Sequence, residues 1–257
     1  MTLSRRFLKH ALYIASAVSV AVSANAHADE LIVSAAASLT NAFKAVSEVF
    51  EQQHPGTKVL LNFGASDALM QQIAKGAPAD VFASADQKAM DKAAIEKVIV
   101  QASRKDFAAN SLVLIVPSDS RFAPAALSDL AAANVKRVAY GDPASVPIGR
   151  YAQGALQAAG VWNAVSAKAV LAANVRQSLD YVSRGEVDAG FVFGTDAAVM
   201  PDKVKVALNV PTQTPISYPI AQVEGSRHAA DAQAFISFVL SPAGQAVLAK
   251  YGFKPAH

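Results

Sequence analysis

The chain has 257 residues, of which 23 are Lys or Arg and 20 are Asp or Glu, and it contains no cysteine. Three of the basic residues and none of the acidic ones fall within the first 28 positions, so the remainder carries 20 of each sign and is nearly neutral. This balance argues against nucleic acid or an anionic membrane surface as a partner, and the lack of cysteine excludes disulfides, thiol chemistry and cysteine-held metal or haem.

Residues 1–28 have the pattern of a secretory signal peptide and are excluded from the predicted fold. Basic residues between Arg5 and Lys9 precede an apolar stretch over residues 11–24, and Ala26-His27-Ala28 suits a signal peptidase. The apolar stretch is shorter than the ~20 residues that a membrane span needs. The pair Arg5-Arg6 partly resembles a twin-arginine signal, so the export route stays open. We expect an exported, soluble, periplasmic protein.

The first element after the signal is predicted to be a buried strand that leads into a helix. Residues 31–37 are apolar or small, and Phe43, Val46 and Phe50 then recur with helical spacing. Ser38 lies where the strand turns into the helix. A serine at this position is most often an N-cap, but the uncovered N–H groups of a helix start also attract anions. Repetition of the same arrangement along the chain favours the second interpretation.

The strand–serine–helix arrangement recurs in the first half of the chain. A predicted strand over residues 58–63 leads to Ser66 at a helix start, and a strand over residues 81–83 leads to Ser84 and Asp86. Such alternation predicts a mostly parallel sheet with helices on both faces, whose ligand lies beyond the carboxyl ends of the strands. Ser38 and Ser66 fall at such ends. Ser84 and Asp86 are expected to cap their own helix.

The alternation starts again after a long apolar strand over residues 110–117. Helices are expected to begin near Ile148, behind a loop with two prolines, and at Val175, with Asn174 as N-cap. Residues 218–223 are expected to return and pair with the strand at residues 112–116. Further strands are expected over residues 136–140, 168–171, 189–193 and 204–210.

Two crossings without a flexible linker predict an α/β protein of two lobes. Each lobe is expected to be a mostly parallel sheet flanked by helices, and the two crossover segments would form a hinge. The predicted parts are a signal peptide (1–28), the first part of lobe 1 (29–109), lobe 2 (110–212), and a return crossover with C-terminal helices that complete lobe 1 (213–257).

Four helix starts are predicted to face the crevice between the lobes, at Ser38, Ser66, Ile148 and Val175. Their donors are two hydroxyls and several backbone N–H groups, which carry no full charge. Neutral donors suit a small oxyanion stripped of its water. Arg150 and Arg176 lie close to these positions in the sequence. We expect their side chains to leave the pocket and join the lobes, the alternative being a charge just behind the donors.

Five stretches resemble the periplasmic molybdate-binding proteins of molybdate ABC transporters. They are AAASLT at 35–40, GAPADVFASAD at 76–86, NSL at 110–112, GDP at 141–143 with Val146-Pro147, and KYGF at 250–253. The resemblance covers the whole chain after the signal peptide.

This resemblance implies a type II periplasmic binding protein fold that captures molybdate, and tungstate as well. It implies that Ser38, Ser66 and the backbone N–H groups of Ile148 and Val175 bind the oxyanion, with no cofactor and no direct bond from the protein to molybdenum. The family's tyrosine position is occupied by Phe193, which can form a pocket wall but cannot donate. Water, a neighbouring hydroxyl such as that of Thr195 or Tyr151, or nothing takes the place of the missing donor. The implied partners are a membrane permease and its ATPase, and the protein is expected to be a monomer.

Three other classes of function remain as alternatives. An enzyme is disfavoured, because the sequence has no Gly-x-Ser-x-Gly turn and no cluster of histidines and carboxylates with metal-ligand spacing. A binding protein for another solute, such as sulfate, phosphate or an organic acid, is the stronger alternative. A ligand-sensing regulatory domain is disfavoured by the signal peptide.

Overall fold

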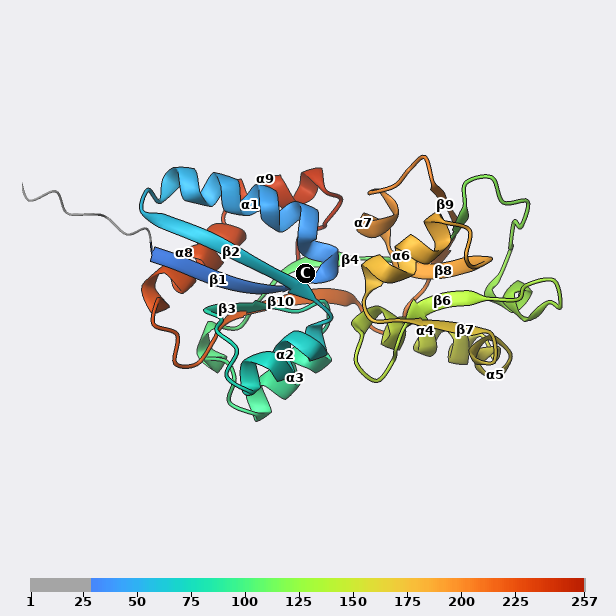
Figure 1. Ribbon diagram of the computed structural model, residues 1–257, viewed down its shortest axis with the longest axis horizontal. Helices are drawn as coiled ribbons and strands as arrows, with labels where there is room; N and C mark the ends of the chain where they lie inside the picture. Colours follow the sequence, from blue (N-terminus) through green and yellow to red (C-terminus); the bar gives the residue numbers. More distant parts are fainter. Residues whose placement is uncertain (1–28, 257) are drawn as a thin grey trace, which may run out of the picture.

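The computed structural model describes residues 29–256, so the predicted signal peptide over residues 1–28 lies outside the described residues. Within this range the protein consists of two lobes that lie side by side, each built on one five-stranded sheet (Figure 1). The two-lobed α/β fold expected from the alternation of strands and helices is confirmed.

The first lobe contains the sheet with strand order β2-β1-β3-β10-β4. Its strands are β1 (Asp29–Ala36), β2 (Thr57–Gly64), β3 (Val81–Ala83), β4 (Lys105–Asn110) and β10 (Ile216–Gln222). All of them except β10 run in the same direction. Its helices are α1 (Thr40–Gln53), α2 (Ser66–Ala74), α3 (Gln87–Ile95), α8 (Ala229–Leu240) and α9 (Pro242–Lys250). Figure 1 shows α1 and α9 on one face of this sheet and α2 and α3 on the other.

The second lobe repeats this plan with strand order β7-β6-β8-β5-β9. Its strands are β5 (Leu112–Pro117), β6 (Val138–Gly141), β7 (Ala169–Ala172), β8 (Ala189–Phe193) and β9 (Val204–Val210). Here β5 alone of the five runs against the others. The helices are α4 (Pro147–Ala158), α5 (Trp162–Ser166), α6 (Val175–Ser183) and α7 (Gly194–Ala197). Short 3-10 turns lie at Ala37–Leu39, Gln101–Ser103 and Leu127–Ala131.

The prediction that residues 218–223 pair with the strand at 112–116 is wrong. Strand β10 pairs with β3 and β4 of the first sheet, whereas both edges of β5 are occupied by β8 and β9. The error follows from overlooking β4, whose Lys105, Asp106 and alanines give a weak strand pattern. The chain therefore crosses to the second lobe at Ser111, between β4 and β5, and returns between β9 and β10.

The C-terminal helices pack back onto the first lobe. Phe235 of α8 is fully buried, and its ring lies 6.0 Å from that of Phe43 and 5.2 Å from that of Phe50, both on α1. These contacts fix α1, and with it the turn that carries Ser38. Within residues 29–256 no single helix is long and apolar enough to cross a membrane, although α8 and α9 together reach that length with a 64° bend between them.

Candidate functional site

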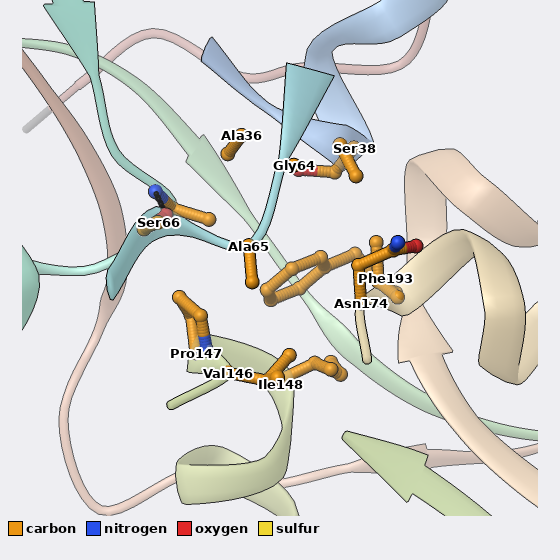
Figure 2. Close-up of a pocket in the computed structure, with 13 residues that line it drawn as sticks. Ala36, Ser38, Gly64, Ala65, Ser66, Val146, Pro147, Ile148, Asn174 and Phe193 are labelled. Carbon is orange, nitrogen blue, oxygen red and sulfur yellow. Dashed lines mark hydrogen bonds between the residues drawn. The ribbon is translucent and has the colours of Figure 1, made fainter. Parts of the chain in front are cut away.

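A small cavity lies between the two lobes, where the carboxyl ends of parallel strands from both sheets meet. Thirteen residues line it, and Figure 2 shows how ten of them converge. The lining comes from the turns after β1, β2 and β3 in the first lobe and after β6, β7 and β8 in the second: Ala36, Ala37, Ser38, Gly64, Ala65, Ser66, Ala85, Val146, Pro147, Ile148, Asn174, Val175 and Phe193. All four predicted ligand-binding residues therefore surround one cavity.

The size of the cavity restricts what it can hold. Only about 10 Å³ of it is open to the centre of a water molecule, roughly the room that one very small molecule or ion takes. Clefts that take organic ligands usually measure about 300–1,000 Å³. The space therefore suits a small ion better than an organic solute.

Ser38 lies in the 3-10 turn that links β1 to α1, and it is buried. Its hydroxyl does not cap α1; its Oγ lies 2.9 Å from the hydroxyl of Tyr218 on β10. The capping interpretation of Ser38 is therefore excluded by the structure. Sequence patterns give no hint of the contact with Tyr218, because the two residues are 180 positions apart.

Ser66 is the first residue of α2 and is fully buried. Its Oγ accepts a hydrogen bond of 3.0 Å from the backbone N–H of Ala85, in the turn after β3. That contact uses a lone pair of the hydroxyl and leaves its hydrogen free to donate. As expected, Asp86 caps α3 by accepting from the N–H of Ala89. The same expectation for Ser84 is wrong, because its hydroxyl donates to the carbonyl oxygen of Asp86 and accepts from the N–H of Asp86 within the turn.

In the second lobe, the start of α4 is pressed against the end of β6. A Cβ atom added to Gly149 would lie 1.9 Å from the carbonyl oxygen of Gly141, and one added to Gly141 would lie 2.4 Å from Cγ1 of Val146. Glycine at both positions is thus a requirement of this close packing. Pro147 opens the helix, so the N–H of Ile148 is the first backbone donor at the cavity wall.

The start of α6 supplies the second backbone donor from this lobe. Asn174 is the N-cap, as predicted, and its side chain accepts from the N–H of Gln177 at 3.1 Å. The N–H groups of the first helical residues have no partner within the helix, and Val175 is the first of them. Two helix N-termini of the second lobe therefore present donors and the positive ends of their dipoles to the cavity.

Phe193, at the end of β8, forms part of the cavity wall, and its ring points towards Ala65 of the first lobe (Figure 2). Two neighbouring hydroxyl groups are placed elsewhere. Tyr151 lines a larger adjacent cavity, and Thr195 accepts from the side chain of Asn110 at 2.9 Å. The wall that Phe193 forms is therefore apolar.

The cavity lining is electrically neutral. Among the thirteen described residues that line it, none has an ionisable side chain. The nearest arginine in the sequence, Arg150 of α4, turns away and binds the first lobe, donating to Asp86 at 2.8 Å and to Asp67 at 2.6 Å. Both carboxylates are buried, and Lys92 also pairs with Asp67.

Arg176 of α6 forms a second connection between the lobes. It pairs with the buried Asp196 of its own lobe and reaches Asn41 at 2.8 Å and the carbonyl oxygen of Ser38 at 3.4 Å in the first lobe. The expectation that both arginines leave the pocket and join the lobes is confirmed.

Asp196 is fully buried, and among the described residues its Oδ2 has no hydrogen-bond partner. Burial raises the pKa of this carboxyl to about 6, although the charge of Arg176 acts in the opposite direction. An ionised Asp196 is therefore costly to keep in this position, even beside an arginine.

Comparisons with known proteins place the chain in a well-defined group. Residues 31–254 match the family model described as bacterial extracellular solute-binding protein. The chain is 39% identical to the molybdate-binding protein ModA of Escherichia coli (strain K12), over 98% of this chain and 99% of that protein. It is 32% identical to the putative ABC transporter substrate-binding lipoprotein YvgL of Bacillus subtilis (strain 168), over 96% of this chain and 98% of that protein.

Solved structures show the same likeness. The substrate binding domain of a putative molybdenum ABC transporter from Clostridium difficile is 37% identical, with a TM-score of 0.68, covering 89% of this chain and 99% of that one. The sulfate-binding protein SubI from Mycobacterium tuberculosis H37Rv has a TM-score of 0.79, covering 89% of this chain and 87% of that one, but at 19% identity it shows the fold alone.

Replacing Arg150 tests whether its ion pairs hold the lobes together. Arg150→Met leaves the buried carboxylates of Asp67 and Asp86 without this partner, and breaking such pairs costs about 3–5 kcal/mol. Because Lys92 still forms an ion pair with Asp67, we expect a smaller effect than this full cost. Urea unfolding should show that the free energy of unfolding falls by at least about 2 kcal/mol. The matched control is Arg184→Met, an exposed arginine at the end of α6, which should change little. Equal stability of the Arg150 variant and the unmodified protein would contradict this interpretation.

The raised pKa of Asp196 predicts a pH dependence of stability. Between the ordinary pKa near 3.8 and the folded-state pKa of about 6, the folded protein binds more protons than the unfolded chain. The contribution of this group to the free energy of unfolding therefore falls as pH rises from about 4 to about 7, by about 3 kcal/mol at most.

Asp196→Asn removes this titration. The free energy of unfolding can be measured in urea at about pH 4.5 and at about pH 7. The difference between the unmodified protein and the variant should be more in favour of the unmodified protein at the lower pH. Parallel pH profiles would mean that the carboxyl titrates normally.

Proposed function

Since the chain belongs to the family of bacterial extracellular solute-binding proteins and has their two-lobed type II fold, we propose that its cavity captures molybdate and delivers it to an ABC transporter. The resemblance to molybdate-binding proteins is confirmed by relatives of that name, with 39% identity over nearly the full length in one case. The observation that carries the proposal is the neutral cavity in which two serines and two helix starts from opposite lobes converge.

The chemistry of the donors supports a small oxyanion. Ser38, Ser66 and the N–H groups of Ile148 and Val175 would each donate to one anion, and hydrogen bonds to a charged group contribute about 1.5–3 kcal/mol each. A metal cation would meet the positive ends of two helix dipoles, which oppose its binding. Molybdenum would therefore be held through its oxygen atoms alone.

Selection would depend on size. Sulfate is a smaller tetrahedron, and it would leave part of the donor set unpaired at a cost of about 1–3 kcal/mol for each buried group. Tungstate is nearly the same size as molybdate and should bind as well. An organic acid would need more room and a charged clamp, and the described lining offers neither.

Capture would proceed by closure of the two lobes. We propose that residues 29–110 and 216–256 form one lobe, that residues 112–210 form the other, and that the two crossovers, at Ser111 and over residues 211–215, act as the hinge. The anion would first meet one lobe. Closure would then exclude water, strengthen each donor contact, and form the ion pairs of Arg150 and the hydrogen bonds of Arg176 across the cleft.

The cellular setting follows from the family and from the first residues of the sequence. We propose that residues 1–28 direct export and are removed, and that the protein works in the periplasm as a monomer without enzymatic activity. The closed form would dock on a membrane permease that an ATPase drives.

A thermal-shift panel of molybdate, tungstate, sulfate, phosphate and chromate tests the proposal. At 100 times its dissociation constant a ligand adds about 2.7 kcal/mol of stability, which for a chain of this size corresponds to a rise of roughly 5–10 °C in Tm. Molybdate and tungstate should produce this rise, and sulfate a much smaller one. A larger shift with sulfate would reassign the solute, and no shift with any member would remove the proposed function.

Replacing the serines tests the donor set. Ser38→Ala and Ser66→Ala each remove one donor, and each should raise the Kd for molybdate by roughly ten- to a hundredfold in calorimetric titrations. The matched control is Ser47→Ala on α1, a buried serine that does not line the cavity, which should bind as the unmodified protein does. A serine variant with unchanged affinity would exclude that hydroxyl from the binding site.

A further inference from the structure

Tyr218 lies directly behind Ser38, outside the cavity lining. It belongs to β10 and is fully buried. Its ring packs among three phenylalanines, with centroids 5.7 Å from Phe193, 5.4 Å from Phe253 and 6.3 Å from Phe107. In these apolar surroundings its hydroxyl lies 2.9 Å from Oγ of Ser38 and 3.2 Å from Nδ2 of Asn110.

The side chain of Asn110 determines the direction of its own hydrogen bond with Tyr218. Its Oδ1 accepts from the N–H of Ser111 at 2.9 Å, which identifies the other end of the amide as the nitrogen. That nitrogen donates to Thr195 and to Tyr218, since an amide nitrogen cannot accept. The hydroxyl oxygen of Tyr218 therefore acts as an acceptor towards Asn110.

By distance either hydroxyl of the Tyr218–Ser38 pair can be the donor, but among the described residues Oγ of Ser38 is the one acceptor bonded to the buried Tyr218 hydroxyl, so the hydrogen of Tyr218 is satisfied only if Tyr218 donates. With Tyr218 as the donor, Oγ of Ser38 accepts, and the hydrogen of Ser38, a residue that lines the cavity, is directed away from Tyr218. Burial raises the pKa of Tyr218 well above its ordinary value, so this hydrogen stays in place at neutral pH. With this assignment the donors run in one direction, from Asn110 through Tyr218 to Ser38 at the cavity wall.

We propose that Tyr218 is a positioning residue for oxyanion binding, which fixes Ser38 as a donor. This inference rests on the proposed function, because it assigns a task to one of the proposed ligand-binding hydroxyls. Without Tyr218, the Ser38 hydroxyl could rotate, and it could then also accept a hydrogen bond from a ligand. Tyr218 would thus contribute both to affinity and to preference for anions that carry no proton.

A double-mutant cycle in molybdate titrations tests this role. Tyr218→Phe removes one hydroxyl and keeps the ring, and it should raise the Kd by about three- to tenfold, as expected for one lost hydrogen bond. In a Ser38→Ala background the same change should alter the Kd less than about twofold, because the group that Tyr218 orients is gone. A purely structural role would give the same factor in both backgrounds.

Selectivity provides a second measurement. Phosphate at neutral pH carries a proton that needs an acceptor, so Tyr218→Phe should lower the ratio of molybdate affinity to phosphate affinity. The matched control is Tyr140→Phe on β6, a buried tyrosine packed against Trp162 and Phe191 in the second lobe, which should change neither quantity.

The outcomes separate this inference from the proposed function. Unmodified protein that fails to bind molybdate would overturn both. Molybdate binding by the unmodified protein, together with an unchanged Tyr218→Phe variant or an equal effect in the two backgrounds, would overturn the role of Tyr218 alone.

Discussion

An α-helix cannot satisfy its own first N–H groups, and this constraint organises the molecule. In each lobe, parallel strands deliver the chain to helix starts at one edge of the sheet. The two sheets turn those edges towards each other, so that donors after β1, β2, β6 and β7 surround one cavity. The packing of the rest of the chain serves to hold these turns in place. The contact between Gly141 and Gly149 sets the start of α4, and the aromatic cluster of α1 and α8 sets the turn of Ser38.

Full charges are kept close to the cavity but out of it. Arg150 and Arg176 follow directly on the two helix starts of the second lobe, yet each is paired with buried carboxylates and reaches across to the first lobe. A cation inside the cavity would attract any anion. Directional neutral donors instead bind most tightly the anion whose oxygen atoms match their positions. The arginines instead hold the two lobes in contact with each other. In this closed arrangement all the donors face a common centre.

The sequence predicted the features that depend on local pattern. The alternation of strands and helices gave the two-lobed α/β fold, and the placement of Ser38, Ser66, Ile148 and Val175 after strand ends brought all four to one cavity. It did not predict features that depend on distant contacts. β4 was missed because its charged and small residues resemble a loop, and the pairing of β10 was therefore misassigned. The preference of serine for N-caps favoured a capping role for Ser38, whereas a tyrosine 180 residues away bonds its hydroxyl.

The position of β10 affects the order in which the molecule can assemble. This strand lies between β3 and β4 in the first sheet, but it is the last strand of the chain, and it is separated from β3 by the entire second lobe. A chain that emerges from its N-terminus onward can complete the second sheet once residue 210 is free, while the first sheet lacks an inner strand until residue 222 follows. The half of the protein that is made first is thus finished last, and it stays open, without a complete core, through most of synthesis.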